Sequence, residues 1–182
     1  MRCPFCFVLH QLKKPIIDQS SAKINCDNLL TFTNNYFESY NPKKIGVSFI
    51  GGEPLLNMEN CENCDDVFSN VANKFDVPYI NFITTNLSMS IGQKEIDFLS
   101  KMSQINVSID GDEQSHNSQR KYVDSKDNSY RIVLRNLKTL VDTGLSSKIS
   151  INATIPTSLI TTAHGKTNTI STSKTRKRMA KR

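Results

Sequence analysis

The chain has 182 residues, of which 37% are hydrophobic and 22% are charged, so it suits one folded domain and excludes wholesale disorder. No apolar run approaches the roughly 18 residues needed to cross a bilayer, and the first residues lack the order of a secretion signal. These features predict a soluble cytoplasmic protein without a membrane partner. The net charge of +6 arises at the C-terminal end, because seven of the 23 basic residues and none of the 17 acidic ones follow Pro156.

Helices and strands are predicted to alternate along the chain. In order, apolar spacing and breaker residues predict helix 28–40, strand 44–50, helix 61–75, strand 79–83, helix 93–102, strand 105–109, helix 130–143 and strand 148–154. Such alternation without hairpin signals implies an α/β fold with a parallel sheet, either open and doubly wound or an arc of a barrel.

The C-terminal segment differs in composition from the rest. We expect residues 157–182 to be a disordered basic tail after a folded core of residues 1–156. A nucleic-acid-binding domain usually carries its basic face on the fold itself. The core has 16 basic and 17 acidic residues, so we expect no nucleic-acid partner and keep a basic-tailed nucleic-acid binder only as a remote alternative.

Four of the five cysteines form two C-x-x-C pairs, Cys3 with Cys6 and Cys61 with Cys64, a pattern that favours metal or cluster ligation over disulfides. Joined in one site, the four thiolates predict a non-catalytic zinc-binding module, which is the main alternative function. Against it, 54 residues separate the pairs, whereas the knuckles of a small zinc module usually lie roughly 12–20 residues apart. Cys26 is expected to be a small buried apolar residue.

Polar and glycine residues follow three of the predicted strands. In parallel sheets, active and binding sites lie at the carboxyl ends of the strands, where these loops converge. Gly, Asn and Asp are also ordinary turn residues, which is the alternative for any one loop. The loops are Gly51-Gly52-Glu53-Pro54, Thr84-Thr85-Asn86 and Asp110-Gly111-Asp112.

Together these motifs resemble the radical S-adenosylmethionine superfamily. The ordered set is Cys3-Pro4-Phe5-Cys6-Phe7, Ser48 to Leu56 with its Gly-Gly-Glu-Pro, Thr84 to Asn86, and Val107 to Gly111 followed by His116 and Arg120. From Met1 to about Ile155 the chain is similar to the peptide- and protein-modifying maturases of that superfamily, including anaerobic sulfatase-maturating enzymes. The resemblance implies a partial (β/α) barrel with four recognisable parallel strands of an expected six.

The resemblance also implies two cofactors. In that superfamily three thiolates hold a four-iron, four-sulfur cluster, and the open iron chelates S-adenosylmethionine. An electron from a flavodoxin- or ferredoxin-type donor then cleaves the sulfonium, and the 5′-deoxyadenosyl radical attacks a peptide or protein substrate.

Roles for individual residues follow from the same resemblance. Cys3 and Cys6 would be cluster ligands, and Phe5 would lie beside the adenine. Glu53 would accept from the methionyl ammonium, Ser108 would bond the ribose, and Arg120 would pair with the methionyl carboxylate. The remaining cofactor-binding candidates on the same rim are Gly51, Gly52, Thr85, Asn86 and Asp110.

Each of these roles has a structural alternative. Glu53 can be a first-turn acid of a helix, Ser108 a buried strand residue and Arg120 a solvated loop charge. His116 precedes the arginine as in the family, and we expect it to have a structural role. Cys61 and Cys64 are expected near a helix start, as surface thiols or an incidental metal site.

The sequence departs from the family pattern at both ends. The pattern C-x-x-x-C-x-x-C places the first cluster cysteine two residues before Met1, so we expect Met1 to be an internal methionine and the first strand to be missing. A sixth strand and a cysteine-rich C-terminal extension do not follow Ile155. We therefore interpret the chain as a fragment, and the sequence leaves its own enzymatic activity open.

Overall fold

The computed structural model describes residues 3–6, 23–122 and 127–154. The chain divides into two units, residues 1–152 and 153–182, and every helix and strand of the described part belongs to the first. The predicted tail at 157–182 lies outside the described residues. No helix of the described part is both long and apolar enough to span a membrane.

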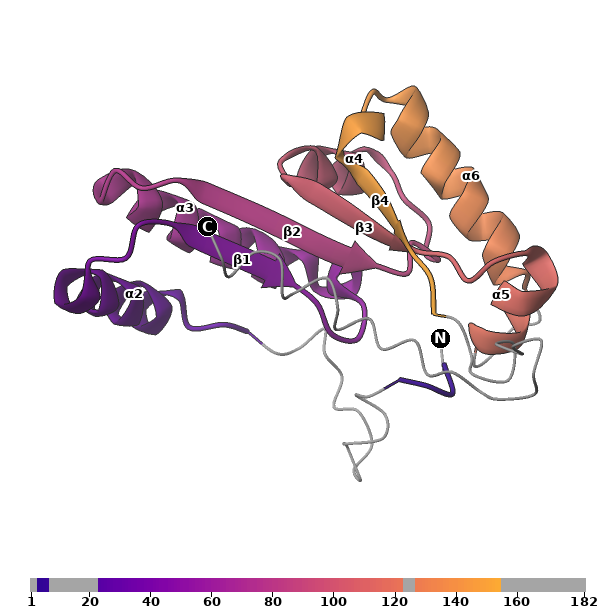
Figure 1. The fold of residues 1–182 in the computed structure, drawn as a ribbon, viewed down its shortest axis with the longest axis horizontal. Helices are drawn as coiled ribbons and strands as arrows, with labels where there is room; N and C mark the ends of the chain where they lie inside the picture. Colours follow the sequence, from indigo (N-terminus) through magenta and orange to yellow (C-terminus); the bar gives the residue numbers. More distant parts are fainter. Residues whose placement is uncertain (1–2, 7–22, 123–126, 155–182) are drawn as a thin grey trace, which may run out of the picture. The chain divides into compact units, whose positions relative to one another are not determined.

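Helices and strands alternate as predicted (Figure 1). In chain order the elements are α2 (Cys26–Tyr40), β1 (Ile45–Phe49), the short 3₁₀ helix η2 (Pro54–Asn57), α3 (Met58–Lys74), β2 (Tyr79–Thr85), α4 (Gln93–Ser100), β3 (Gln104–Ser108), α5 (Glu113–Gln119), α6 (Ser129–Asp142), η3 (Ser146–Lys148) and β4 (Ile149–Asn152).

Most differences from the predicted elements are of a few residues at their ends. The predicted helix 61–75 starts earlier, at Met58, because η2 runs directly into α3. Strand β2 extends past the predicted residue 83 because Thr84 and Thr85 pair with Asn106 and Val107. Helix α5 and the two 3₁₀ helices were not predicted.

The four strands form one parallel sheet in the order β1-β2-β3-β4. The register places Phe49, Ile83, Ile105 and Ile149 in one row across the sheet. Because side chains alternate along a strand, this apolar row lies on one face. The predicted α/β class with four parallel strands is thus confirmed.

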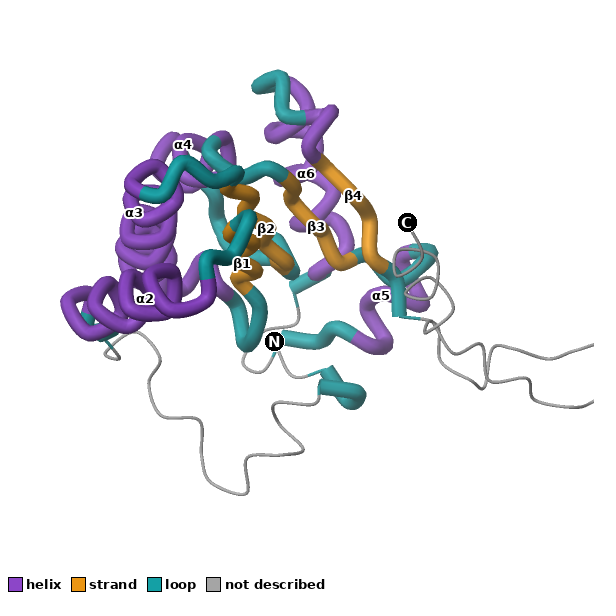
Figure 2. Tube along the Cα trace, turned by 60° about the vertical axis from the view of Figure 1, so that its left-hand side comes forward, coloured by secondary structure: helices purple, strands orange, loops and turns teal. Residues whose placement is uncertain are grey.

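Helices α3, α4 and α6 cover that apolar face (Figure 2). Ile83, Phe98, Leu99, Ile105 and Leu140 are almost completely buried there. Each large apolar side chain removed from water contributes about 1.5–3 kcal/mol, so this layer holds the sheet and helices together. A second, smaller cluster joins α2 to β1 and α3 through Phe37, Ile45, Val71 and Ala72.

The opposite face of the sheet is polar and half-exposed. The Gln104 amide donates to Asn106 Oδ1 at 3.0 Å and to Ser150 Oγ at 2.9 Å, across β3 and β4. By the alternation of side chains, Ser108 lies on this same face, in register with Asn152.

Two glycines shape the loops that leave the sheet at its carboxyl edge. Gly51 (φ 133°) follows β1 and Gly111 (φ 68°) follows β3. Both dihedrals lie in the region that residues with a Cβ rarely adopt, so glycine permits both turns. The two loops carry Glu53 and Asp110.

Candidate cofactor site

Glu53 ties the loop after β1 to the end of β2. Its Oε1 accepts from the Thr85 hydroxyl at 2.6 Å and from the Leu55 N–H at 3.3 Å, while Oε2 accepts from the Asn86 N–H at 2.7 Å. The bond from Leu55 makes Glu53 the N-cap of η2. The alternative of an acid at a helix start therefore describes part of the role of Glu53. Thr85 and Asn86 also contact Glu53 directly.

The Glu53 carboxylate is buried and forms hydrogen bonds rather than an ion pair within the described part of the chain. The residue is only 8% exposed, and no basic side chain of the described residues lies within ion-pair distance of it. Burial raises the pKa of Glu53, and the hydrogen bonds from Thr85, Asn86 and Leu55 oppose that rise. A desolvated carboxylate of this kind gains strongly from a cationic hydrogen-bond donor.

Arg120 and Asp110 form a buried ion pair at the carboxyl end of β3. Arg120 Nε lies 2.6 Å from Asp110 Oδ2, and Nη2 lies 3.0 Å from Oδ1. Arg120 is 7% exposed, so the alternative of a solvated loop charge is wrong. Its Nη1 has no hydrogen-bond partner within the described part of the chain and is not fully buried. One edge of the guanidinium is therefore held by Asp110, and Nη1 can still donate.

The first C-x-x-C pair lies against this arginine. The Cys6 N–H donates to the Cys3 carbonyl at 3.0 Å and closes a turn. The Phe5 ring within that turn stacks on Arg120, with 5.2 Å between its centroid and Cζ. Burial raises the pKa of the Cys3 thiol, and the positive charge of Arg120 opposes this. Figure 2 shows the loop of residues 3–6 beside α5, whose C-cap residue is Arg120.

Ser108 and His116 lie next to the ion pair in sequence or in space. Ser108 is the last residue of β3 and is buried, as expected for the alternative of a buried strand residue. Its hydroxyl has no hydrogen bond to other described residues. His116 is fully buried in α5, and its Nδ1 accepts from the Asp110 N–H at 3.2 Å. The expected structural role of His116 is thus matched by a contact to Asp110.

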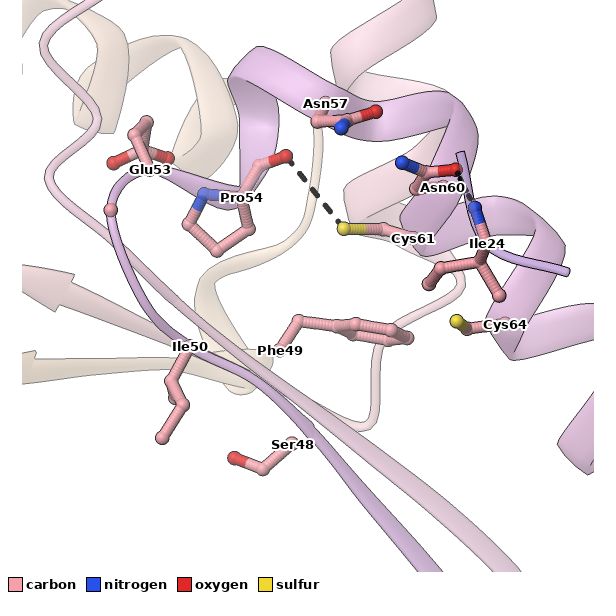
Figure 3. A pocket seen from close by; sticks show the side chains of 11 residues that line it. Ile24, Ser48, Phe49, Ile50, Glu53, Pro54, Asn57, Asn60, Cys61 and Cys64 are labelled. Atoms are coloured by element: carbon pink, nitrogen blue, oxygen red, sulfur yellow. Dashed lines mark hydrogen bonds between the residues drawn. The ribbon is translucent and has the colours of Figure 1, made fainter. Parts of the chain in front are cut away.

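The second C-x-x-C pair is not grouped with Cys3 and Cys6, but it shares a pocket with Glu53. Cys61 and Cys64 lie on α3 and line a pocket of about 380 Å³ that also includes Ile24, Phe49 and Pro54 (Figure 3). The Cys61 thiol donates to the Pro54 carbonyl, with 3.7 Å between sulfur and oxygen. Burial, reinforced by Cys64 and Glu53, raises the pKa of Cys61 to about 11, so this thiol is protonated at neutral pH.

The described residues include all five cysteines, and among them no three His, Cys, Asp or Glu side chains are placed to hold a metal ion. The four-thiolate zinc site is therefore wrong. Cys26 is also not the buried apolar residue expected: it is half-exposed at the start of α2, with its sulfur 3.8 Å from the Ile24 carbonyl.

Three of the predicted cofactor-binding residues, Thr85, Asn86 and Asp110, bond to another predicted site residue. Thr85 and the Asn86 backbone hold Glu53, and Asp110 holds Arg120. The sequence reasoning missed α5, which connects Asp110 to Arg120. The available signal was Asp112, whose side chain accepts from the Ser115 N–H as an N-cap.

A protein family and several solved structures are similar to this chain. A family model described as a 4Fe-4S single cluster domain matches residues 1–133. The solved structure of native anSMEcpe, an anaerobic sulfatase-maturating enzyme, with bound AdoMet and Cp18Cys peptide is similar at 22% identity and a TM-score of 0.60. The match covers 83% of this chain and 38% of that one. Hexahistidine-tagged anSMEcpe with bound AdoMet gives 22% identity, a TM-score of 0.61, and coverage of 84% and 39%.

The chain thus spans less than two fifths of the length of these structures, and the likeness confirms the fold that the sequence resemblance implied. No protein with a curated description matches the chain. The family match covers well over half of the chain and includes both the Cys3–Cys6 turn and Arg120. The chain belongs to the family of 4Fe-4S single cluster domains.

Proposed function

We propose that this chain is the cofactor-binding part of a radical S-adenosylmethionine enzyme that modifies a peptide or protein. The observation that carries the proposal is the contact between the cysteine turn and Arg120, through the Phe5 ring. This contact brings two predicted cluster ligands next to the group predicted to bind the methionyl carboxylate. Segments more than 100 residues apart in the sequence thereby share one location.

The donor set fits part of a cluster site. Cys3 and Cys6 would supply two thiolates, whereas a four-iron cluster with one open iron takes three. None of the other three cysteines is grouped with them, so the third ligand would come from outside the described residues. When bound, the cluster would supply the electron for reductive cleavage of S-adenosylmethionine.

The charges fit the methionyl group. This group carries an ammonium and a carboxylate. The site offers the buried Glu53 carboxylate, which has no ion pair with a basic side chain of the described residues, and the Arg120 guanidinium with an open donor. The Phe5 ring and the Asp110 carboxylate hold the guanidinium from two sides. Ser108, whose hydroxyl is unpaired within the described chain, would bond the ribose.

For the substrate and the electron donor we propose only the class of molecule. Two of the similar solved structures contain bound peptides, which supports a peptide or protein substrate here. We propose that the substrate binds on the polar face of the sheet, which carries Gln104, Asn106 and Ser150. A flavodoxin- or ferredoxin-type protein would deliver the electron.

Calorimetric titration of S-adenosylmethionine tests this function. The protein is the full chain, extended so that a cysteine stands two residues before Met1, and loaded anaerobically with iron and sulfide. Glu53→Gln and Arg120→Ala should each weaken binding by roughly 30- to 1000-fold, because each removes a charged hydrogen bond in a desolvated site. Ser108→Ala should cost several-fold, about 1 kcal/mol.

Matched controls separate charge at the site from charge in general. Glu38→Gln and Arg135→Ala change exposed residues on α2 and α6 and should leave the affinity unchanged. Wild-type affinity in both Glu53→Gln and Arg120→Ala would refute the proposed site.

A further inference from the structure

His116 is fully buried, and its Nε2 is the one buried side-chain nitrogen or oxygen of the described residues without a hydrogen-bond partner. Because Nδ1 accepts from the Asp110 N–H, the ring is neutral and carries its proton on Nε2. Leaving a buried donor unpaired costs free energy, so an apolar side chain would suit this position better if it only filled space. The bond that Nδ1 makes must therefore explain why a histidine occupies this position.

His116 contacts both residues of the ion pair. Its Nδ1 fixes the backbone of Asp110, and its carbonyl accepts from the Arg120 N–H at 2.8 Å. The Arg120 carbonyl in turn accepts from the Ser129 hydroxyl at 2.7 Å, which ties the end of α5 to α6. The loop from 110 to 120 is thus fastened at both of its ends, with His116 between them.

The conformation of this loop determines where the free Nη1 donor of Arg120 points. Gly111 gives the loop a left-handed turn immediately after Asp110, so the direction of the Asp110 side chain follows from the conformation of this loop. If Asp110 rotates, the two bonds to Nε and Nη2 are lost together, and the free Nη1 no longer has a defined place. The bond from the Asp110 N–H to His116 Nδ1 is a side-chain contact that holds the Asp110 backbone, from which the carboxylate projects.

We propose that His116 is a positioning residue that, through its Nδ1, fixes Asp110 and so aims Arg120 at the carboxylate of the bound ligand. The inference rests on the proposed function for the identity of that ligand. It excludes a role for His116 as a proton donor or acceptor toward substrate, because the ring is fully buried and Nδ1 is engaged.

The first test uses the chain without any cofactor. In a ¹⁵N-labelled protein, the Arg120 Nε–H signal is assigned by its loss in Arg120→Lys, and its hydrogen-exchange rate is measured. His116→Asn places an amide oxygen close to the position of Nδ1 and should leave the rate within about threefold of wild type. His116→Gln, with its polar group at the position of Nε2, should exchange about tenfold faster, as for one lost hydrogen bond. His116→Leu should behave like His116→Gln.

A space-filling role predicts the opposite order. His116→Leu would then protect Arg120 best and His116→Asn least, and that result would overturn the proposal. If His116→Leu does not fold, the comparison of the Asn and Gln variants decides the matter alone. Equal exchange rates in those two variants would also overturn it.

The second test measures S-adenosylmethionine affinity in the extended, cluster-loaded chain. His116→Gln should bind about tenfold more weakly, and His116→Asn should be rescued to near wild type. An acid–base role would instead lower turnover in both variants without changing affinity, and would refute the positioning role. If the wild-type chain does not bind S-adenosylmethionine, the proposed function fails, while the exchange rates still decide whether His116 positions Arg120.

Discussion

The Glu53 carboxylate and the Thr85 hydroxyl are 2.6 Å apart, and both are buried. The Thr85 hydroxyl also accepts from the Leu87 N–H at 2.9 Å, so one oxygen links the carboxylate to the backbone after β2. Because two neighbouring strand ends depend on this oxygen, it stabilises the rim as well as orienting Glu53.

We expect Thr85→Val to lower the free energy of unfolding by about 1–3 kcal/mol, since it leaves a buried carboxylate oxygen and a buried N–H short of a partner. Thr85→Ser keeps the hydroxyl and should recover most of that loss. Urea denaturation of the full chain measures both. Equal losses in the two variants would show that the methyl group, not the hydroxyl, matters at this position.

The ion pair gives a larger expected effect. Asp110→Asn leaves the buried Arg120 charge without its counterion and should lower the free energy of unfolding by about 3–5 kcal/mol. The control is Asp142→Asn, which breaks the exposed pair with Lys138 and should change stability by less than about 0.5 kcal/mol. A loss in Asp110→Asn as small as in the control would contradict the buried geometry.

The alternation of elements could be predicted because the larger helices and strands carry a clear apolar pattern. Val133, Asn136 and Leu140 of α6, for example, recur at the spacing that buries one face of a helix. Helix α5 could not be found that way, because its residues Glu113–Gln119 are almost all polar and only His116 is buried. Its stability comes from the Asp112 cap and from contacts with α6, which periodicity does not report.

The convergence of the candidate residues on one edge of the sheet could also be predicted, but not which of them pair. The rule that loops gather at the carboxyl ends of parallel strands placed Glu53, Thr85 and Asp110 on one rim. Which of them holds which depends on loop conformation, and the sequence gives no distance between Asp110 and Arg120. The stacking of Phe5 on Arg120 joins residues separated by more than a hundred positions, and no local pattern encodes such a contact.

Stability should depend on pH through His116. Burial lowers the pKa of His116 below its ordinary value of 6.5, with Arg120 adding to the effect and Asp110 opposing it. The unfolded chain therefore takes up this proton first as the pH falls. The neutral His116 therefore contributes fully to the free energy of unfolding above about pH 6.5. This contribution is lost as the pH drops through the lower pKa of the folded state, by at most about 1.4 kcal/mol per pH unit.

Thermal unfolding between pH 5 and 7.5 measures this dependence, and His116→Asn is the reference because it cannot titrate. The raised pKa of Glu53 acts in the opposite direction, since its stabilisation is lost as the pH rises, but it is common to both proteins and cancels in the difference. The groups that face the ring are Asp110, Arg120 and Tyr130. Parallel pH profiles for the wild type and His116→Asn would contradict the lowered pKa.

The two cysteine pairs should differ in iron binding. In the chain extended to place a cysteine two residues before Met1, anaerobic reconstitution should yield about four irons per chain, and Cys3→Ser or Cys6→Ser should abolish the cluster because each removes one of three thiolates. Cys61→Ser and Cys64→Ser should leave it intact, because those thiols are not grouped with Cys3 and Cys6, and Cys61, with a pKa of about 11, stays protonated. The same extension with serine in place of the added cysteine is the matched control and should not support the cluster. Full iron and sulfide content with the serine extension would mean that the third ligand is not at that position, and loss of iron in Cys61→Ser or Cys64→Ser would return the second pair to the site.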